Sequence, residues 1–168
     1  MDHVRQLDQF RQTVFYVGLA ELVQPTLVKS TDYGYAVRAI EMCWDWIEQR
    51  NVSGLEMFCL YHNEDDYGVE PAMSVEHDPL MWNTWGCISR ALLYTAYCAY
   101  LDEGKTLPET VEGMGSPEIM GYFMDYFHAV VGDSELPELF ESCLLQLPED
   151  QLTQSIVREK LSDLALEG

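Results

Sequence analysis

The stretch PLMWNTWGCISRALLYTAYCAYLDEG, residues 79–104, decides the fold because it contains both ends of one long helix and almost no charge between them. Asp78 followed by Pro79 is a capping carboxylate with a proline at the first helical position, and Gly104 is a common helix terminator. From Pro79 to Leu101 the stretch carries a single charge, Arg90. We therefore predict a long helix whose neighbours cover most of its surface.

The same stretch has about the length of a membrane span. Arg90 falls at its middle, where a charge is most costly in a bilayer, and uncharged polar residues are scattered along it. The sequence therefore favours a central helix of a globular domain, and we expect no membrane association.

Proline, glycine and helix-capping residues also mark helix ends on both sides of this segment. Residues 31–51 place two apolar stripes and one polar stripe around a helix, which indicates a helix covered on two sides. No alternating run suggests a strand. The predicted helices span about 2–23, 31–51, 53–61, 78–104, 116–132, 134–147 and 148–166. The predicted fold class is all-α, a single compact domain over residues 1–168 of about seven helices, with two central and largely buried.

Charge limits the partners. The 168 residues include 29 acidic and 9 basic side chains, a formal net charge of −20, while 48% of the residues are hydrophobic. The apolar content excludes a disordered acidic tail, and the charge opposes binding to nucleic acids and anionic membranes. It favours cations and basic proteins, although solubility alone would also explain it.

Cysteine usage and the N-terminus bear on the compartment. Five cysteines lie in helix-like apolar segments, without a CxxC pair. We expect buried free thiols in a reducing compartment. MDHVRQLDQF, residues 1–10, has neither the basic start nor the apolar run of a signal peptide. These features predict a cytoplasmic location.

The most acidic stretch is HNEDDYGVEPAMSVEHD, residues 62–78, which has no lysine or arginine. His62 and His77 are fifteen residues apart, which matches no zinc-ligand spacing, and the stretch does not follow a calcium-loop pattern. Asp125 and His128 form one i, i+3 pair, whereas a di-iron bundle needs two such Glu-x-x-His motifs. We expect no metal, cofactor or catalytic residue, and a helical metalloenzyme using these residues is the less favoured alternative.

Aromatic residues accompany the acids. Acidic side chains that attract a partner, beside aromatic side chains that anchor it, are typical of protein-binding surfaces. Trp82 and Trp85 share one helix face, which would fit either this role or packing in the core. The candidate partner-binding residues are Glu64, Asp65, Asp66, Tyr67, Glu70, Glu76, Asp78, Trp82 and Trp85.

Three motifs carry a resemblance to a known family. They are CWDW (43–46) leading into VSG (52–54), NEDDYG (63–68), and the aromatic helix 85–100 followed by LPE (107–109). Over about residues 36–115 the chain resembles the all-α immunity proteins of bacterial polymorphic toxin and contact-dependent growth inhibition systems. Past Gly115 the resemblance ends, and that part is expected to vary with the partner.

The resemblance implies a non-enzymatic role. Such proteins bind the toxic C-terminal domain of a sibling cell's effector and neutralise it in the cytoplasm. Many of these toxins are nucleases, whose clefts must be basic to hold phosphates. The expected partner is therefore a basic toxin domain, with no direct nucleic-acid binding and with the free protein a monomer. An acidic helical scaffold without a toxin partner is the alternative.

Overall fold

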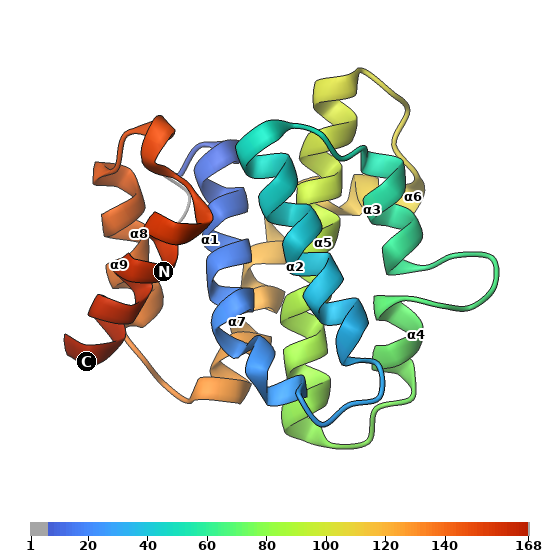
Figure 1. Ribbon diagram of the computed structural model, residues 1–168, viewed down its shortest axis with the longest axis horizontal. Coiled ribbons are helices and arrows are strands. Elements are labelled where there is room, and N and C mark those ends of the chain that lie inside the picture. The colour runs from blue at the N-terminus through green and yellow to red at the C-terminus, as the bar shows by residue number, and fades with distance from the viewer. Residues whose placement is uncertain (1–6, 168) are drawn as a thin grey trace.

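The computed structural model describes residues 7–167, which form nine α-helices and three short 3₁₀ turns and contain no strand (Figure 1). The all-α prediction is confirmed. The helices are α1 (Gln9–Val23), α2 (Tyr33–Gln49), α3 (Gly54–Tyr61), α4 (Val69–Ser74), α5 (Pro79–Glu103), α6 (Glu109–Glu112), α7 (Glu118–Val131), α8 (Leu136–Gln146) and α9 (Gln154–Glu167). The 3₁₀ turns are η2 (Gln24–Leu27), η3 (Gly113–Gly115) and η4 (Glu149–Gln151).

The seven predicted helices are present, with ends that differ by a few residues. The prediction for residues 2–6 of the first helix lies outside the described residues. Two short helices were not predicted: α4, inside the acidic stretch, and α6. Residues 62–78 are therefore two connections with a helix between them rather than one continuous loop.

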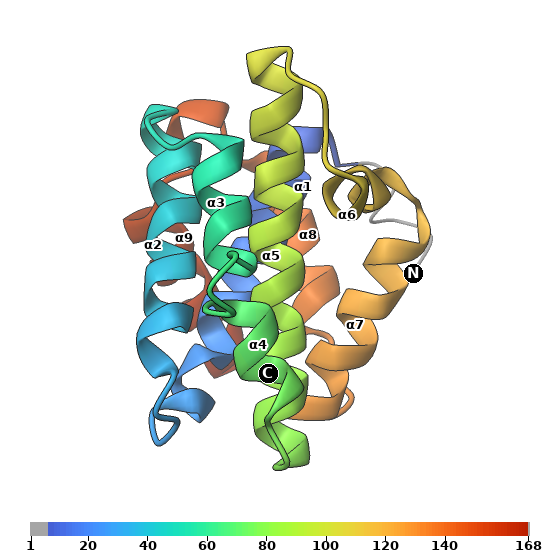
Figure 2. The ribbon, with the colours of Figure 1, turned by 90° about the vertical axis from the view of Figure 1, so that its right-hand side faces the viewer.

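Helix α5 occupies the centre of the bundle, as the sequence predicts. The Asp78 carboxylate accepts a hydrogen bond from the Met81 backbone N–H at 3.0 Å, and the helix ends at Gly104, which has a φ of +67°. Helices α1, α2, α3, α4 and α7 all pack against it (Figure 2). Within residues 7–167, no helix combines the length and the apolar character that crossing a membrane requires.

The two predicted apolar stripes of α2 are both covered. Ile40, Trp44 and Ile47 on one stripe and Met42 and Trp46 on the other are at most 5% exposed. The polar stripe lies toward solvent. Helix α2 is therefore the second largely buried helix that the pattern indicates.

The C-terminal hairpin of α8 and α9 covers the side of α1 that faces away from α5 (Figure 1). Phe140 stacks on Phe15 with ring centroids 5.8 Å apart. Glu21 of α1 accepts hydrogen bonds from Trp44 Nε1 at 2.8 Å, Gln154 Nε2 at 3.1 Å and Arg158 Nε at 2.6 Å. The hairpin is thus attached mainly to α1, away from the acidic stretch.

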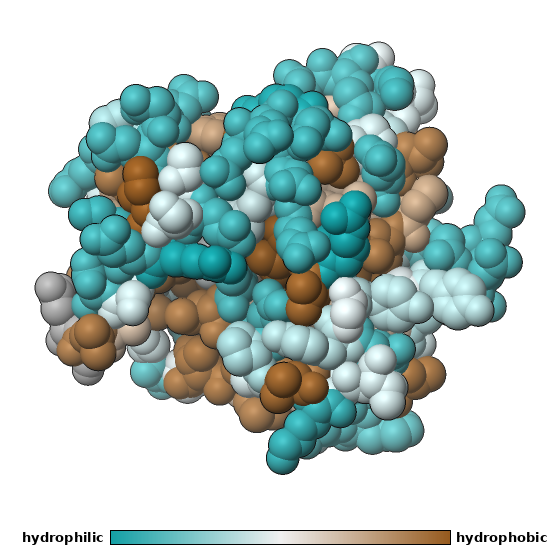
Figure 3. Space-filling model, in the orientation of Figure 1, coloured by the Kyte–Doolittle hydropathy of each residue, from teal (hydrophilic) through white to brown (hydrophobic). Residues whose placement is uncertain are grey.

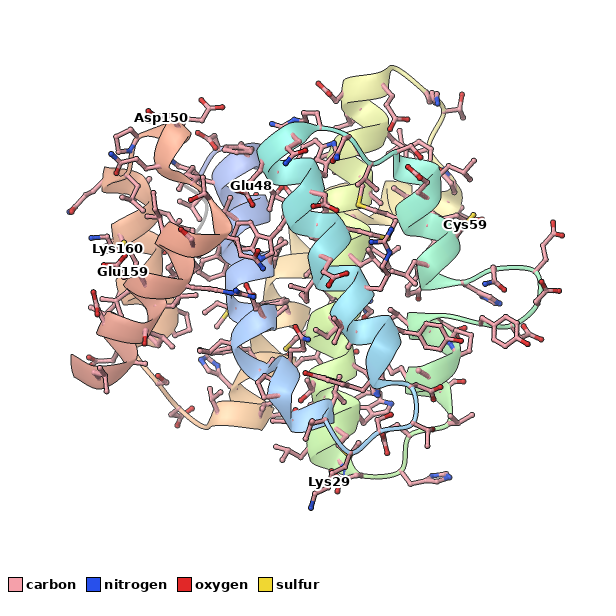
Figure 4. All side chains as sticks on the ribbon, viewed as in Figure 1. Lys29, Glu48, Cys59, Asp150, Glu159 and Lys160 are labelled. Carbon is pink, nitrogen blue, oxygen red and sulfur yellow. The ribbon has the colours of Figure 1, made fainter. Side chains whose placement is uncertain are left out.

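The cysteine prediction is correct for three of the five positions and wrong for one. All five thiols are free; Cys43, Cys87 and Cys98 are buried and Cys143 is half-buried. Burial raises the pKa of the Cys43 thiol to about 12, so it stays protonated and unreactive at neutral pH. Cys59 is exposed on the outer side of α3 (Figure 4), because the periodicity of this eight-residue helix leaves one face uncovered.

Candidate partner-binding surface

The connection between α3 and α4, residues 62–68, projects from the body of the molecule, and we call it the acidic loop (Figure 1). Its backbone closes on itself: the Asn63 N–H donates to the Tyr67 carbonyl at 3.3 Å, and the Asp66 N–H donates to the Asn63 carbonyl at 3.1 Å. The Asn63 side-chain oxygen also accepts from the N–H groups of Asp65 and Tyr67, at 2.9 and 3.2 Å. The loop therefore has a defined conformation although its tip lies in solvent.

Gly68 makes this closure possible. Its φ of +124° and ψ of −163° lie in a region that only glycine occupies readily. A Cβ at this position would lie 2.1 Å from the Leu60 carbonyl oxygen, which is backbone and cannot rotate away. The glycine thus allows α4 to start directly beside the end of α3.

We expect Gly68→Ala to lower the free energy of unfolding by about 2 kcal/mol, because it combines backbone strain with this clash. Denaturant unfolding measures the loss. Gly104→Ala is the matched control, since Gly104 also has a positive φ but a Cβ there would meet nothing within 4 Å. Equal losses in the two variants would show that close contact with Leu60 is not important.

The tip of the loop concentrates uncompensated negative charge. Glu64, Asp65 and Asp66 are exposed, and Tyr67 beside them is 57% exposed. Among the residues that the structure describes, none of these three carboxylates pairs with a lysine or an arginine. In the space-filling view, the projecting edge of the molecule is mostly hydrophilic (Figure 3). This edge carries a strong negative potential toward an approaching molecule.

His62 joins the loop to α4. Its Nε2 lies 3.2 Å from an Asp66 carboxylate oxygen, and its Nδ1 lies 3.4 Å from a carboxylate oxygen of Glu70. The two nitrogens point to different carboxylates, so the three side chains do not converge on one point. This arrangement fixes the loop against α4 and differs from that of a metal site.

Glu76 and Asp78 belong to the connection between α4 and α5 and have local structural roles. Glu76 accepts hydrogen bonds from the backbone N–H groups of His77 and Asp78, at 3.1 and 3.3 Å. Asp78 caps α5. Both carboxylates add negative charge to this side of the molecule, but their hydrogen bonds make them less suitable than the tip residues for variants that change charge alone.

The two candidate tryptophans have different environments. Trp82 is 38% exposed, and its ring meets that of Tyr126 edge-on with centroids 5.5 Å apart. Trp85 is completely buried, one turn further along α5 and toward the core. The placement of Trp85 on a partner-binding surface is therefore wrong, because neighbouring helices cover its whole side chain.

Tyr126 of α7 extends this surface and was missed from the sequence. Its ring covers Gly86, where a Cβ would approach the ring to 2.5 Å. The signal in the sequence was Gly86 itself, because a glycine in the interior of a helix often marks a close approach by another group. Periodicity alone does not say which group approaches.

The alternative of a helical metalloenzyme requires a cluster of metal ligands. Within residues 7–167, no group of three or more histidine, cysteine, aspartate or glutamate side chains is arranged to hold a metal ion. Asp125 is exposed and His128 is half-buried on α7. His62, as described above, is engaged by two separate carboxylates.

Two surface grooves lie elsewhere on the molecule. The larger, about 640 Å³, lies between α1, α5 and the start of α7, and its lining includes Gln12, Tyr94 and Tyr97. The smaller, about 470 Å³, lies between α1 and α9, and its charged residues Glu21 and Arg158 bind each other. Neither groove includes a residue of the acidic loop.

Comparison with known proteins places the chain. The model of one protein family, described as Immunity protein Imm6, matches residues 11–130. These residues run from the first turn of α1 to the next-to-last residue of α7. No curated protein and no solved structure matches the chain. The match covers well over half of the sequence and includes the acidic loop, Trp82 and Tyr126, while α8 and α9 lie outside it. The chain therefore belongs to the Imm6 family of immunity proteins.

Proposed function

We propose that this immunity protein neutralises its cognate toxin domain by placing the acidic loop against a basic surface of that domain. The observation that carries the proposal is the combination of three exposed carboxylates, Glu64, Asp65 and Asp66, none paired with a lysine or an arginine of the described residues, with a loop whose backbone is closed by hydrogen bonds. A preorganised charged loop loses little conformational entropy on binding, so more of its interaction energy appears as affinity.

The charge of the whole chain supports the same proposal. A net charge of −20 attracts a basic partner from a distance and accelerates encounter. The partner we propose is a nuclease domain, because a cleft that holds nucleic-acid phosphates must itself be basic. Carboxylates of the acidic loop would occupy positions that phosphates otherwise take, without any catalytic step by the immunity protein.

The proposed surface also contains an apolar element. Tyr67 at the tip of the loop and Trp82 near the start of α5 are partly exposed aromatic side chains. Aromatic residues of this kind frequently supply most of the binding energy of an interface. Charge would then govern the rate of association, and the aromatic contacts would govern the lifetime of the complex.

Calorimetric titration tests the proposal. The titrant is the C-terminal domain encoded by the adjacent upstream gene, at low and at high salt. We expect tight one-to-one binding by a monomeric protein that weakens as salt rises, because salt screens exposed charges. Tight binding that does not change with salt would move the interface to an apolar surface, and no binding at either salt would favour the scaffold alternative.

A further inference from the structure

Arg90 lies near the middle of α5, on the side of the helix that faces α7. The carbon of its guanidinium group is 5.7 Å from the centroid of the Tyr126 ring on α7. Tyr61 of α3 is also close enough for the charge of Arg90 to act on its hydroxyl group. A cation thus lies against the Tyr126 ring, with Tyr61 within the range of its charge.

This cation has no anionic partner within the described residues. No carboxylate there lies within 4 Å of the guanidinium group, and the buried Nε atom has no hydrogen-bond partner among them. By contrast, Arg11 and Arg158 both pair with carboxylates. In a chain with 29 acidic residues, an unpaired and half-buried arginine is unexpected, because burying an uncompensated charge is costly.

Glu70 of α4, whose charge also acts on the Tyr61 hydroxyl, does not pair with Arg90. Its carboxylate lies 3.4 Å from His62 Nδ1 instead. The face of the Tyr126 ring compensates part of the charge through a cation–π contact. The N–H donors of the guanidinium group still have no acceptor from the described part of the chain.

The surroundings hold the group in place. Gly86 leaves room for the Tyr126 ring, and Trp82 packs against the edge of that ring. Burial raises the pKa of Tyr61 even though the charge of Arg90 opposes the shift, so Tyr61 stays neutral. The Tyr126 ring, held between Gly86 and Trp82, thus supports one side of the cation.

We propose that Arg90 receives a carboxylate side chain of the toxin domain, beside the Tyr126 ring. This inference rests on the proposed function and adds a second contact of opposite sign to it. A planar guanidinium group binds a carboxylate through two parallel hydrogen bonds, which fixes orientation as well as contributing affinity. The acidic loop would attract the basic partner, and Arg90 would set the register by selecting one acidic residue within the partner's basic surface.

The test uses the full-length protein and the toxin domain encoded by the adjacent upstream gene, with binding kinetics measured for Arg90→Gln and Arg90→Lys. We expect Arg90→Gln to raise Kd about thirtyfold, mainly through faster dissociation, since it removes a charge-assisted pair. Arg90→Lys should recover only part of the affinity, because an ammonium group lacks the two-pronged geometry. Lys160→Gln, on the far side of the molecule (Figure 4), makes the same charge change and should leave Kd unchanged.

Other outcomes overturn the inference, and they separate it from the proposed function. If the wild-type protein binds and Arg90→Gln binds equally well, Arg90 is not at the interface and the proposed function stands. If the wild-type protein does not bind, both fail. Thermal unfolding of each variant excludes a purely structural role: a large loss of stability in Arg90→Gln with unchanged Kd would assign Arg90 to folding alone.

Discussion

Replacing the charges at the tip of the acidic loop should slow association with the toxin domain about a hundredfold at low salt, because steering by complementary charge accelerates encounter by up to a thousandfold. The variant we would make combines Glu64→Lys, Asp65→Lys and Asp66→Asn. Asparagine is chosen at position 66 because Asp66 has a φ of +59°, a conformation that asparagine tolerates better than lysine. Asparagine also keeps a polar contact with His62.

The matched control carries the same change of charge on the far side of the molecule, in Asp150→Lys, Glu159→Lys and Asp163→Asn. Asp150 and Glu159 lie on the C-terminal hairpin, away from the acidic loop (Figure 4). All three control positions are exposed, so the changes should not affect folding. Stopped-flow association rates over a range of salt concentrations measure both variants.

The comparison separates local from overall charge. If the loop forms the interface, the loop variant loses most of the salt dependence, whereas the control variant binds only a few times more slowly. Equal slowing in both variants would contradict the assignment of the loop and leave only the net charge of the chain as the cause. A loop variant with unchanged kinetics would place the interface elsewhere on the molecule.

Helix boundaries could be predicted because their signals are local. Ser53 accepts a hydrogen bond from the Glu56 N–H at 3.1 Å, while the Glu56 carboxylate accepts from the Ser53 N–H at 2.8 Å, which is the capping box that the sequence indicates. The pair Asp78 and Pro79 starts α5 in the same way. Such signals require only a few neighbouring residues and no knowledge of the tertiary structure.

Helix α4 could not be predicted in this way. It has six residues, with Pro71 among them, and is too short for its apolar residues to show a period. Val69 and Ala72 are buried, and α4 packs against α5. Tertiary contact therefore stabilises this helix, and its presence turns the acidic stretch into a compact projecting loop followed by a helix.

The exposure of the candidate residues could be predicted only in part for a related reason. Periodicity places Trp82 and Trp85 on the same face of α5. It does not show how much of that face the other helices cover. Full burial begins between them, since Trp82 packs against Tyr126 and remains 38% exposed while Trp85 is 0% exposed. The contact between Arg90 and Tyr126 could not be predicted, because the two residues come together only through the packing of α7 on α5.

Trp85→Ala should lower the free energy of unfolding by about 4 kcal/mol, whereas Trp82→Ala should change it by no more than about 1 kcal/mol. The difference follows from burial, because Trp85 is 0% exposed and its removal leaves a large cavity in the core. Denaturant unfolding at constant pH measures both variants. A small domain has only about 5–15 kcal/mol of stability, so Trp85→Ala should shift the midpoint severely.

Trp85→Phe separates the cavity from the indole nitrogen. Trp85 Nε1 is buried and has no hydrogen-bond partner among the described residues, so replacing the indole by a phenyl ring removes an unsatisfied donor while keeping most of the packing. Trp85→Phe should therefore retain most of the stability that Trp85→Ala loses. A Trp85→Phe variant as unstable as Trp85→Ala would mean that the nitrogen has a partner, such as a buried water molecule, that stabilises the core.

Variants at positions 82 and 85 should affect stability and toxin binding in opposite ways. If Trp82 is an anchor for the toxin domain, Trp82→Ala raises Kd at nearly constant stability, because aromatic anchors at interfaces contribute to affinity without contributing to the core. Trp85→Phe, in contrast, should leave Kd unchanged, since no partner reaches a fully buried side chain. Reversed effects, with binding sensitive to position 85 and indifferent to position 82, would require α5 to rearrange when the complex forms.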